Sequence, residues 1–237
     1  MTDMDWYAEF AGQARRRQLR PEPEWACGAV LDPVVVRSVQ RFQVGESGDG
    51  ENLIASAGRH RAAVELFVEE ERTHARLLAR LLEAAGARTI DGHWSDALFI
   101  RVRRACGPRL ELMVLLIAEV VALGYYRALR DGAGDALTTE VAARILADEE
   151  RHVPFHVDRL RERGIHGFVR AVWRVLTAGA VGIVLFGHGR ALRGLGVPRI
   201  AFAAETWARF EQVLVDVHRG PSPVPGPRLR ARPRGLV

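Results

Sequence analysis

Residues 145–156 of the chain read ILADEERHVPFH, and residues 64–78 read VELFVEEERTHARLL. Both stretches have the spacing of apolar residues that is typical of an amphipathic helix, and in both a glutamate is followed three residues later by a histidine. The pairs are Glu71 with His74 and Glu149 with His152. Residues three apart share one face of a helix, so each pair can offer a carboxylate oxygen and an imidazole nitrogen to one metal ion. Either pair alone could arise by chance on a helix surface.

A third acid, Glu119, strengthens the metal interpretation. It interrupts the apolar run of residues 110–123, where a carboxylate is rarely buried without a partner or a metal. Residues equally far from the turn of a helical hairpin face each other, and the midpoint of Glu119 and Glu149 is Gly134. Gly134 lies in the turn-forming sequence DGAGD, residues 131–135. The spacing therefore predicts that these two acids face each other near the middle of a hairpin.

The corresponding acid of the first hairpin is less sharply defined. Glu46 and Glu71 have their midpoint between the helix-breaking Gly58 and Arg59. Asp49 and Glu51 are alternative candidates for this first position. We expect Glu46 to be the ligand.

The complete pattern resembles the ferritin-like di-iron carboxylate superfamily. Its details, including FQVGE at residues 42–46 and DEERHVPFH at residues 148–156, are most similar to a bacterial ferritin-like group without an assigned reaction. The resemblance covers about residues 33–163 and implies a four-helix bundle with a long crossover between its second and third helices. It also implies that Glu71 and Glu149 bridge two metal ions, that Glu46 and Glu119 are terminal ligands, and that His74 and His152 bind one ion each.

The predicted fold class is all-α. Bundle helices are expected over residues 33–57, 59–85, 108–130 and 137–163, with a short helix near 5–18 and another in the crossover at 95–106. Two additional C-terminal helices are expected over residues 167–192 and 198–219. The expected organisation is an N-terminal arm (1–32), the bundle with its metal site (33–163), C-terminal helices packed on the bundle (164–219) and a disordered Pro/Arg-rich tail (220–237).

The first C-terminal helix is very apolar. Its uncharged stretch, residues 175–187, is shorter than the about 20 residues that span a bilayer, so we expect no integral membrane protein. The helix should pack on the bundle or on a second subunit, which would make the protein a homodimer. Cys27 and Cys106 form no framework and the N-terminus lacks an apolar signal core, so we expect a cytoplasmic protein.

Charge excludes an obvious nucleic-acid partner. All 34 basic residues are arginine and the net charge is +5, but four arginines near the C-terminus supply +4, which leaves 5 − 4 = +1 for residues 1–227. They are Arg228, Arg230, Arg232 and Arg234. The body of the chain is therefore nearly neutral and carries no basic footprint for nucleic acid.

Four carboxylates and two imidazoles suit two divalent ions. Oxygen and nitrogen ligands without thiolate favour iron or manganese, so we expect two iron ions, or alternatively a Mn/Fe or di-manganese pair. Such a centre would act on dioxygen or peroxide. The leading interpretation is an oxidase or oxygenase on an unknown small-molecule substrate. The alternatives are an iron-handling or peroxide-scavenging protein and a non-catalytic helical interaction bundle.

Four further residues lie close to the predicted ligands along the helices. His156 lies on the same helix face as His152. It is either a further metal ligand or, by default, a histidine that is hydrogen-bonded within the protein and binds no metal. Tyr126 is seven residues past Glu119 and is either redox-active or, more commonly, a core tyrosine. Asp148 and Glu70 each precede a motif glutamate; they are candidate acceptors for an imidazole N–H or else solvated surface acids.

Overall fold

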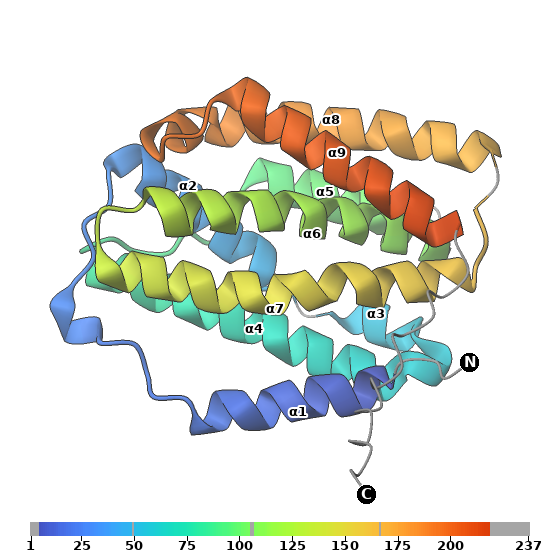
Figure 1. Ribbon diagram of the computed structural model, residues 1–237, viewed down its shortest axis with the longest axis horizontal. Helices are drawn as coiled ribbons and strands as arrows, with labels where there is room; N and C mark the ends of the chain where they lie inside the picture. The colour runs from blue at the N-terminus through green and yellow to red at the C-terminus, as the bar shows by residue number, and fades with distance from the viewer. Residues whose placement is uncertain (1–4, 49, 105–106, 166, 219–237) are drawn as a thin grey trace, which may run out of the picture.

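A computed structural model describes residues 5–48, 50–104, 107–165 and 167–218, and these residues contain helices and no β-strand (Figure 1). The all-α prediction is therefore confirmed for the described residues. The α-helices are α1 (Trp6–Leu19), α2 (Pro33–Glu46), α3 (Glu51–Ala55), α4 (Arg61–Ala84), α5 (Trp94–Arg104), α6 (Gly107–Gly132), α7 (Ala136–Arg161), α8 (Gly167–Gly194) and α9 (Arg199–His218).

Two hairpins form the centre of the molecule: α2 packs on α4, and α6 packs on α7. Local chemistry fixes where these helices begin. The carboxylate of Asp32 accepts a hydrogen bond from the amide of Val34 at 2.8 Å, and Pro33 occupies the first turn of α2. The carboxylate of Asp135 caps α7 in the same way through the amide of Thr138, also at 2.8 Å.

The first bundle helix is shorter than the sequence suggests. We expected it to run to about Ala57, but α2 ends at Glu46 and the chain resumes as the short helix α3. Gly50 between them has φ +69°, and a Cβ atom there would lie 2.5 Å from a methyl group of Val68 on α4. Gly50 therefore has no room for a side chain, and it lies in the break between α2, which ends at the predicted ligand Glu46, and α3. Asp49, one of the alternative ligands, lies outside the described residues.

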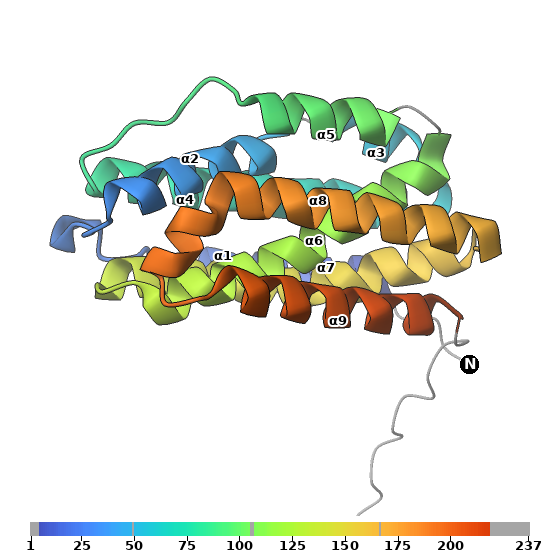
Figure 2. The same ribbon diagram turned by 90° about the horizontal axis from the view of Figure 1, so that it is seen from above.

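A long connection joins the two hairpins. After α4 the chain returns along the length of the bundle through α5, so that α4 and α6 run in the same direction (Figures 1 and 2). Helix α5 packs on α6 and also contacts α2. The connection therefore closes one side of the central bundle.

The remaining helices form an outer shell. Helix α1 packs on α4, α9 packs on α6, α7 and α8, and α8 packs on α2, α6 and α9. The N-terminal arm thus contributes a helix of its own. Cys106 and the predicted disordered tail (220–237) lie outside the described residues.

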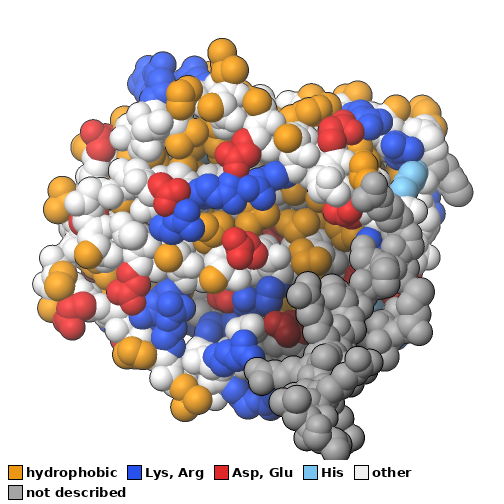
Figure 3. All heavy atoms as spheres, in the orientation of Figure 1, with side chains coloured by type: hydrophobic (Ala, Val, Ile, Leu, Met, Phe, Trp, Pro, Cys, Tyr) orange, Lys and Arg blue, Asp and Glu red, His pale blue; other side chains and the backbone are white. Residues whose placement is uncertain are grey.

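Two helices, α6 and α8, are long and apolar enough to cross a membrane by length and composition. Their environments differ: 83% of the most apolar window is buried in α6, but only 17% in α8. Hydrophobic side chains are visible along the upper edge of the molecule, where α8 lies (Figure 3). Length and hydropathy alone therefore do not place either helix in a membrane.

Candidate metal centre

Six side chains from α2, α4, α6 and α7 converge at the centre of the bundle. Two sets of four residues each have ligand atoms that all lie within 4.8 Å of one another, and Glu71 and Glu149 belong to both sets. The first set is Glu46, Glu71, His74 and Glu149, and the second is Glu71, Glu119, Glu149 and His152. Both sets draw on the two motif-bearing helices α4 and α7, and each adds one acid from α2 or α6.

The distances between these atoms suit a shared coordination sphere. His152 Nδ1 lies 3.2 Å from Glu71 Oε1 and 3.3 Å from Glu119 Oε2. His74 Nδ1 lies 3.3 Å from Glu149 Oε1. Ligands that bind one metal ion at about 2.0–2.2 Å are separated by about 2.8–3.6 Å, as these atoms are.

The atoms that face the cluster lack hydrogen-bond partners. Glu71 Oε1, Glu149 Oε2, His74 Nδ1 and His152 Nδ1 are all buried and have no hydrogen-bond partner within the described structure, although the imidazole nitrogens lie 3.2–3.6 Å from the carboxylate oxygens. An unpaired buried polar atom normally costs about 1–3 kcal/mol, and four of them in one small volume require an explanation. Bound cations would supply the missing partner to all four.

The far side of each imidazole is held by an acid. His74 Nε2 lies 3.3 Å from Asp148 Oδ2, and His152 Nε2 lies 3.2 Å from Glu70 Oε2. A carboxylate acceptor favours the proton on Nε2, which leaves the Nδ1 lone pair directed at the cluster. Asp148 and Glu70 are therefore not simply solvated surface acids: they touch the predicted ligands, and Glu70 is buried.

Two arginines balance these acids. Arg151 Nη2 donates to Glu70 Oε1 at 2.9 Å and also pairs with Asp148. Arg17, from the N-terminal helix α1, forms a second ion pair with Glu70. The two guanidinium groups tie α1, α4 and α7 together around the back of the imidazoles.

Tyr126 touches the first predicted ligand. Its hydroxyl donates a hydrogen bond of 2.5 Å to Glu46 Oε1, and both side chains are buried. Burial, together with the negative charge of Glu46, raises the pKa of Tyr126 well above its ordinary value. The phenol therefore keeps its proton at neutral pH and acts as a donor that positions the last residue of α2.

His156 lies beside the cluster but belongs to neither set of four. Its Nε2 is 3.4 Å from Glu119 Oε1, and the ring is fully buried. Burial lowers the pKa of His156 to about 4, so the ring is neutral at pH 7. The side chain borders the predicted ligand Glu119.

The crowded carboxylates shift the pKa values of groups within the cluster. Burial, followed by the negative charge of Glu46, raises the pKa of Glu71 well above its ordinary value. Burial alone would lower the pKa of His74, but the adjacent carboxylates of Asp148 and Glu149 outweigh it and raise that pKa to about 9. His74 therefore holds a proton at neutral pH that a bound metal ion would displace.

A cavity of about 420 Å³ reaches the cluster from the side of α5 and α8. Its wall is mainly apolar and includes the four predicted carboxylate ligands, Glu46, Glu71, Glu119 and Glu149. Some residues of its wall are also exposed, among them Leu98 of α5 and Val175 and Gly179 of α8. The cavity therefore joins the buried acids to the outer surface, and its volume is within the range of small-molecule sites.

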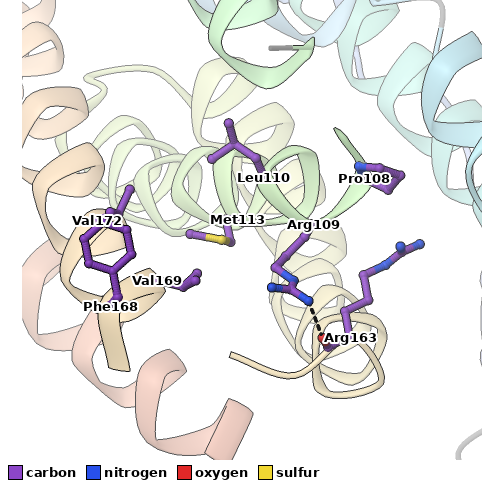
Figure 4. A pocket seen from close by; sticks show the side chains of 8 residues that line it. All are labelled: Pro108, Arg109, Leu110, Met113, Arg163, Phe168, Val169 and Val172. Atoms are coloured by element: carbon purple, nitrogen blue, oxygen red, sulfur yellow. Dashed lines mark hydrogen bonds between the residues drawn. The ribbon is translucent and has the colours of Figure 1, made fainter. Parts of the chain in front are cut away.

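A second hollow, of about 500 Å³, lies away from the cluster, near the start of α6 and α8 (Figure 4). Leu110 and Met113 of α6 and Phe168 and Val172 of α8 lie along it, and Arg109 donates to the carbonyl of Arg163 across one side. It contains none of the predicted ligands.

The six predicted ligands lie in the cluster, and the four further residues, Tyr126, Asp148, Glu70 and His156, each contact one of them. The alternative acid Glu51 is exposed at the start of α3. Arg17 and Arg151 were missed. Arg151 lies inside the second motif, between Glu149 and His152, which is a signal that could have been used. Arg17 comes from the N-terminal arm, where no motif marks it.

Comparison with protein-family models, with curated proteins and with solved structures finds no match to this chain.

Proposed function

We propose that the protein holds two iron ions in this cluster, as a ferritin-like di-iron carboxylate protein, and uses them to activate dioxygen or peroxide. The observation that carries the proposal is the set of four buried, unpaired donor atoms on Glu71, Glu149, His74 and His152. These atoms lie 3.2–3.6 Å from one another without a hydrogen bond of normal geometry between them, a spacing that suits ligands sharing a metal ion. The donors are oxygen and nitrogen only, which favours iron or manganese.

The helix arrangement supports the ferritin-like assignment. Two hairpins, joined by a connection that runs back along the bundle, present one acid each from α2 and α6 and a Glu-x-x-His pair each from α4 and α7. This is the distribution of ligands in ferritin-like carboxylate proteins. Glu71 and Glu149, which belong to both sets, are the natural bridging ligands.

The protein side chains around the ions have separate tasks. Asp148 and Glu70 hold the imidazoles by Nε2 so that Nδ1 points inward. Tyr126 holds Glu46 by a hydrogen bond. Two reduced iron ions with open coordination positions would supply electrons to dioxygen or peroxide.

The cavity favours an oxidase or oxygenase over iron storage. An aqueous path for ions would be lined by polar groups, whereas this cavity is lined mainly by apolar side chains such as Phe99, Leu115 and Ile183. Such a wall excludes water and suits a small apolar substrate. We therefore propose a small, largely apolar molecule as the second reactant.

Elemental analysis of the purified protein tests the metal assignment. We expect about two iron ions per chain, and less than about half an ion in Glu149→Ala, because Glu149 belongs to both sets. The matched control is Glu150→Ala, which removes the exposed neighbouring acid and should keep both ions. Wild-type protein with less than about half an ion per chain would contradict the proposal.

Oxygen consumption by the iron-loaded protein distinguishes an oxidase or oxygenase from an iron-storage protein. An oxidase or oxygenase should consume oxygen in proportion to added reductant without taking up more iron. Continued uptake of iron well beyond two ions per chain would instead indicate storage.

A further inference from the structure

The outward face of α8 has no partner within the described chain. Phe168, Val175 and Phe186 are 81%, 71% and 80% exposed. Smaller residues between them, including Ala178 and Gly182, are exposed as well. Together with Ala171, Val172 and Gly179 they form a stripe along one side of the helix, called here the α8 stripe. Contiguous exposed apolar surface of this kind marks an interaction site.

The α8 stripe carries no charge. Arg170 and Arg174 are the only charged residues between 168 and 186, and both turn toward α9. There, Arg170 lies 3.0 Å from His218 Nε2 and Arg174 forms a paired contact with Glu211 at 2.7–2.8 Å. The opposite side of the helix is packed against the molecule through Trp173, Thr177 and other buried residues. The stripe is thus the outer surface of a well-anchored helix.

Small residues at the centre of the stripe favour a protein partner over a lipid surface. A Cβ atom added at Gly179 or at Gly182 would meet nothing within 4 Å, so a neighbour has room to approach the backbone. Close approach through small residues is typical of helix–helix contacts. Helices that lie on membrane surfaces instead combine an apolar face of Trp, Phe and Leu with a polar face rich in Lys and Arg.

The order of large and small residues makes the stripe complementary to itself. In an antiparallel pair centred on residue 177, Val175 lies opposite Gly179 of the partner subunit, and Val172 lies opposite Gly182 of the partner subunit. This register sets each exposed valine of the stripe against an exposed glycine. Such matching of large with small residues allows two helices to interdigitate.

The same register gives Phe186 a place to pack. It brings Phe186 of the partner subunit level with Phe168, beside the hollow lined by Leu110, Met113 and Val172 (Figure 4). Each copy therefore offers a protruding ring at one end of α8 and an apolar hollow at the other.

From these observations we infer that two copies of the chain pair antiparallel through α8. The pairing would also cover the cavity that leads to the metal cluster, because Val175 and Gly179 belong to both the stripe and the cavity wall. Each subunit then closes the other's cavity from solvent. The pairing itself does not depend on metal chemistry.

Sedimentation velocity tests the pairing. We expect a dimer for the wild type, and loss of the dimer for Val175→Glu, which would place two unpaired carboxylates in the contact. The matched control is Leu19→Glu, on α1, which introduces the same charge at a side chain that is 86% exposed and should leave the dimer intact. A monomeric wild type, or a dimer that survives Val175→Glu, would overturn the inference.

Flotation with vesicles of phosphatidylcholine and phosphatidylserine examines the membrane alternative. The paired stripe is covered, so the wild-type dimer should not float with the vesicles. A monomer that floats through the α8 stripe, and no longer does so as Val175→Glu, would overturn the inference in favour of a lipid surface.

Single cysteines test the register. In a Cys27→Ser, Cys106→Ser background, Ala178→Cys places the two thiols about 3 Å apart along the helix axes, because residue 178 is one position from the centre. Ala171→Cys, equally exposed but six positions from the centre, separates them by about 18 Å, beyond the reach of a disulfide. We expect rapid cross-linking at 178 and none at 171. The reverse result, or equal cross-linking at both positions, would contradict the antiparallel register.

Discussion

Helices α6 and α8 have nearly the same length and both pass a hydropathy test for membrane spans, yet they have opposite surroundings. Helix α6 is buried on nearly all sides, whereas α8 is buried on one side only. The inward acid of α6, Glu119, lies in the candidate metal centre, and the inward histidine of α8, His188, packs on Phe42 and Tyr125. Hydropathy alone therefore does not distinguish a core helix from a helix with one uncovered face. The positions of the polar residues and the sizes of the apolar residues do distinguish them.

Matched valine-to-glutamate changes should separate the two helices most sharply. Val120 of α6 is buried, and Val120→Glu should lower the free energy of unfolding by more than about 4 kcal/mol, or roughly 10 °C in Tm, because it buries an unpaired carboxylate. Val175→Glu in α8 should change the stability of the monomer by about 0.5 kcal/mol or less. Thermal unfolding followed by circular dichroism checks both. Equal losses would mean that the outer face of α8 is packed within one chain.

The acid of α6 should control metal content. Glu119 belongs to only one set of four ligands, so Glu119→Ala should reduce iron from about two ions per chain to about one. Glu111 on the same helix is also buried but lies outside both sets, and Glu111→Ala should leave the iron content unchanged. Elemental analysis provides the measurement. Full iron content in Glu119→Ala would remove that residue from the proposed ligand set.

The inward histidine of α8 should make stability depend on pH. Burial, with a smaller contribution from the positive charge of Arg41, lowers the pKa of His188 from 6.5 to about 4. The unfolded chain therefore binds a proton between these values that the folded chain does not, and stability falls as pH drops from 6.5 to 4, by at most about 3 kcal/mol.

His188→Gln should remove this part of the pH dependence while it keeps a partner for the Ser38 hydroxyl, which lies 2.7 Å from His188 Nδ1. Urea unfolding at several pH values gives the difference between the variant and the wild type. If the difference in the free energy of unfolding between variant and wild type stays constant from neutral pH to about pH 4, His188 is not held neutral in the folded protein.

The smallest expected effect concerns one glycine in each helix. Gly182→Ala in α8 meets open space and should stabilise the monomer by about 0.5–1 kcal/mol, best measured in the Val175→Glu background. In α6, a Cβ atom at Gly124 would lie 3.0 Å from the ring of Phe202, so Gly124→Ala should gain less or lose stability. An equal gain in the free energy of unfolding for both variants, measured in urea, would indicate that there is unused space beside Gly124 of α6.

The central cluster could be anticipated because helical geometry is regular. Glu119 and Glu149 are equally far from the turn at Gly134, and residues at equal distances in a hairpin face each other. The structure places both acids in one set of potential ligands. Periodicity and turn position were sufficient there because both hairpin helices run without interruption past their acids.

Other features depend on packing between distant segments. The early end of α2 is accompanied by a close approach of Gly50 to Val68, which no local pattern encodes. The ion pair of Arg17 with Glu70 joins residues 53 positions apart. Which face of α8 remains uncovered likewise depends on where α2, α6 and α9 lie.

We propose that two iron ions lie between Glu71 and Glu149. The most direct measurement is an anomalous difference map from crystals of the purified protein, recorded on both sides of the iron absorption edge. We expect two iron peaks that share these two carboxylates, with His74 bound to one ion and His152 to the other. A map without peaks at the cluster, or with the six side chains hydrogen-bonded only to one another and to water, would contradict it.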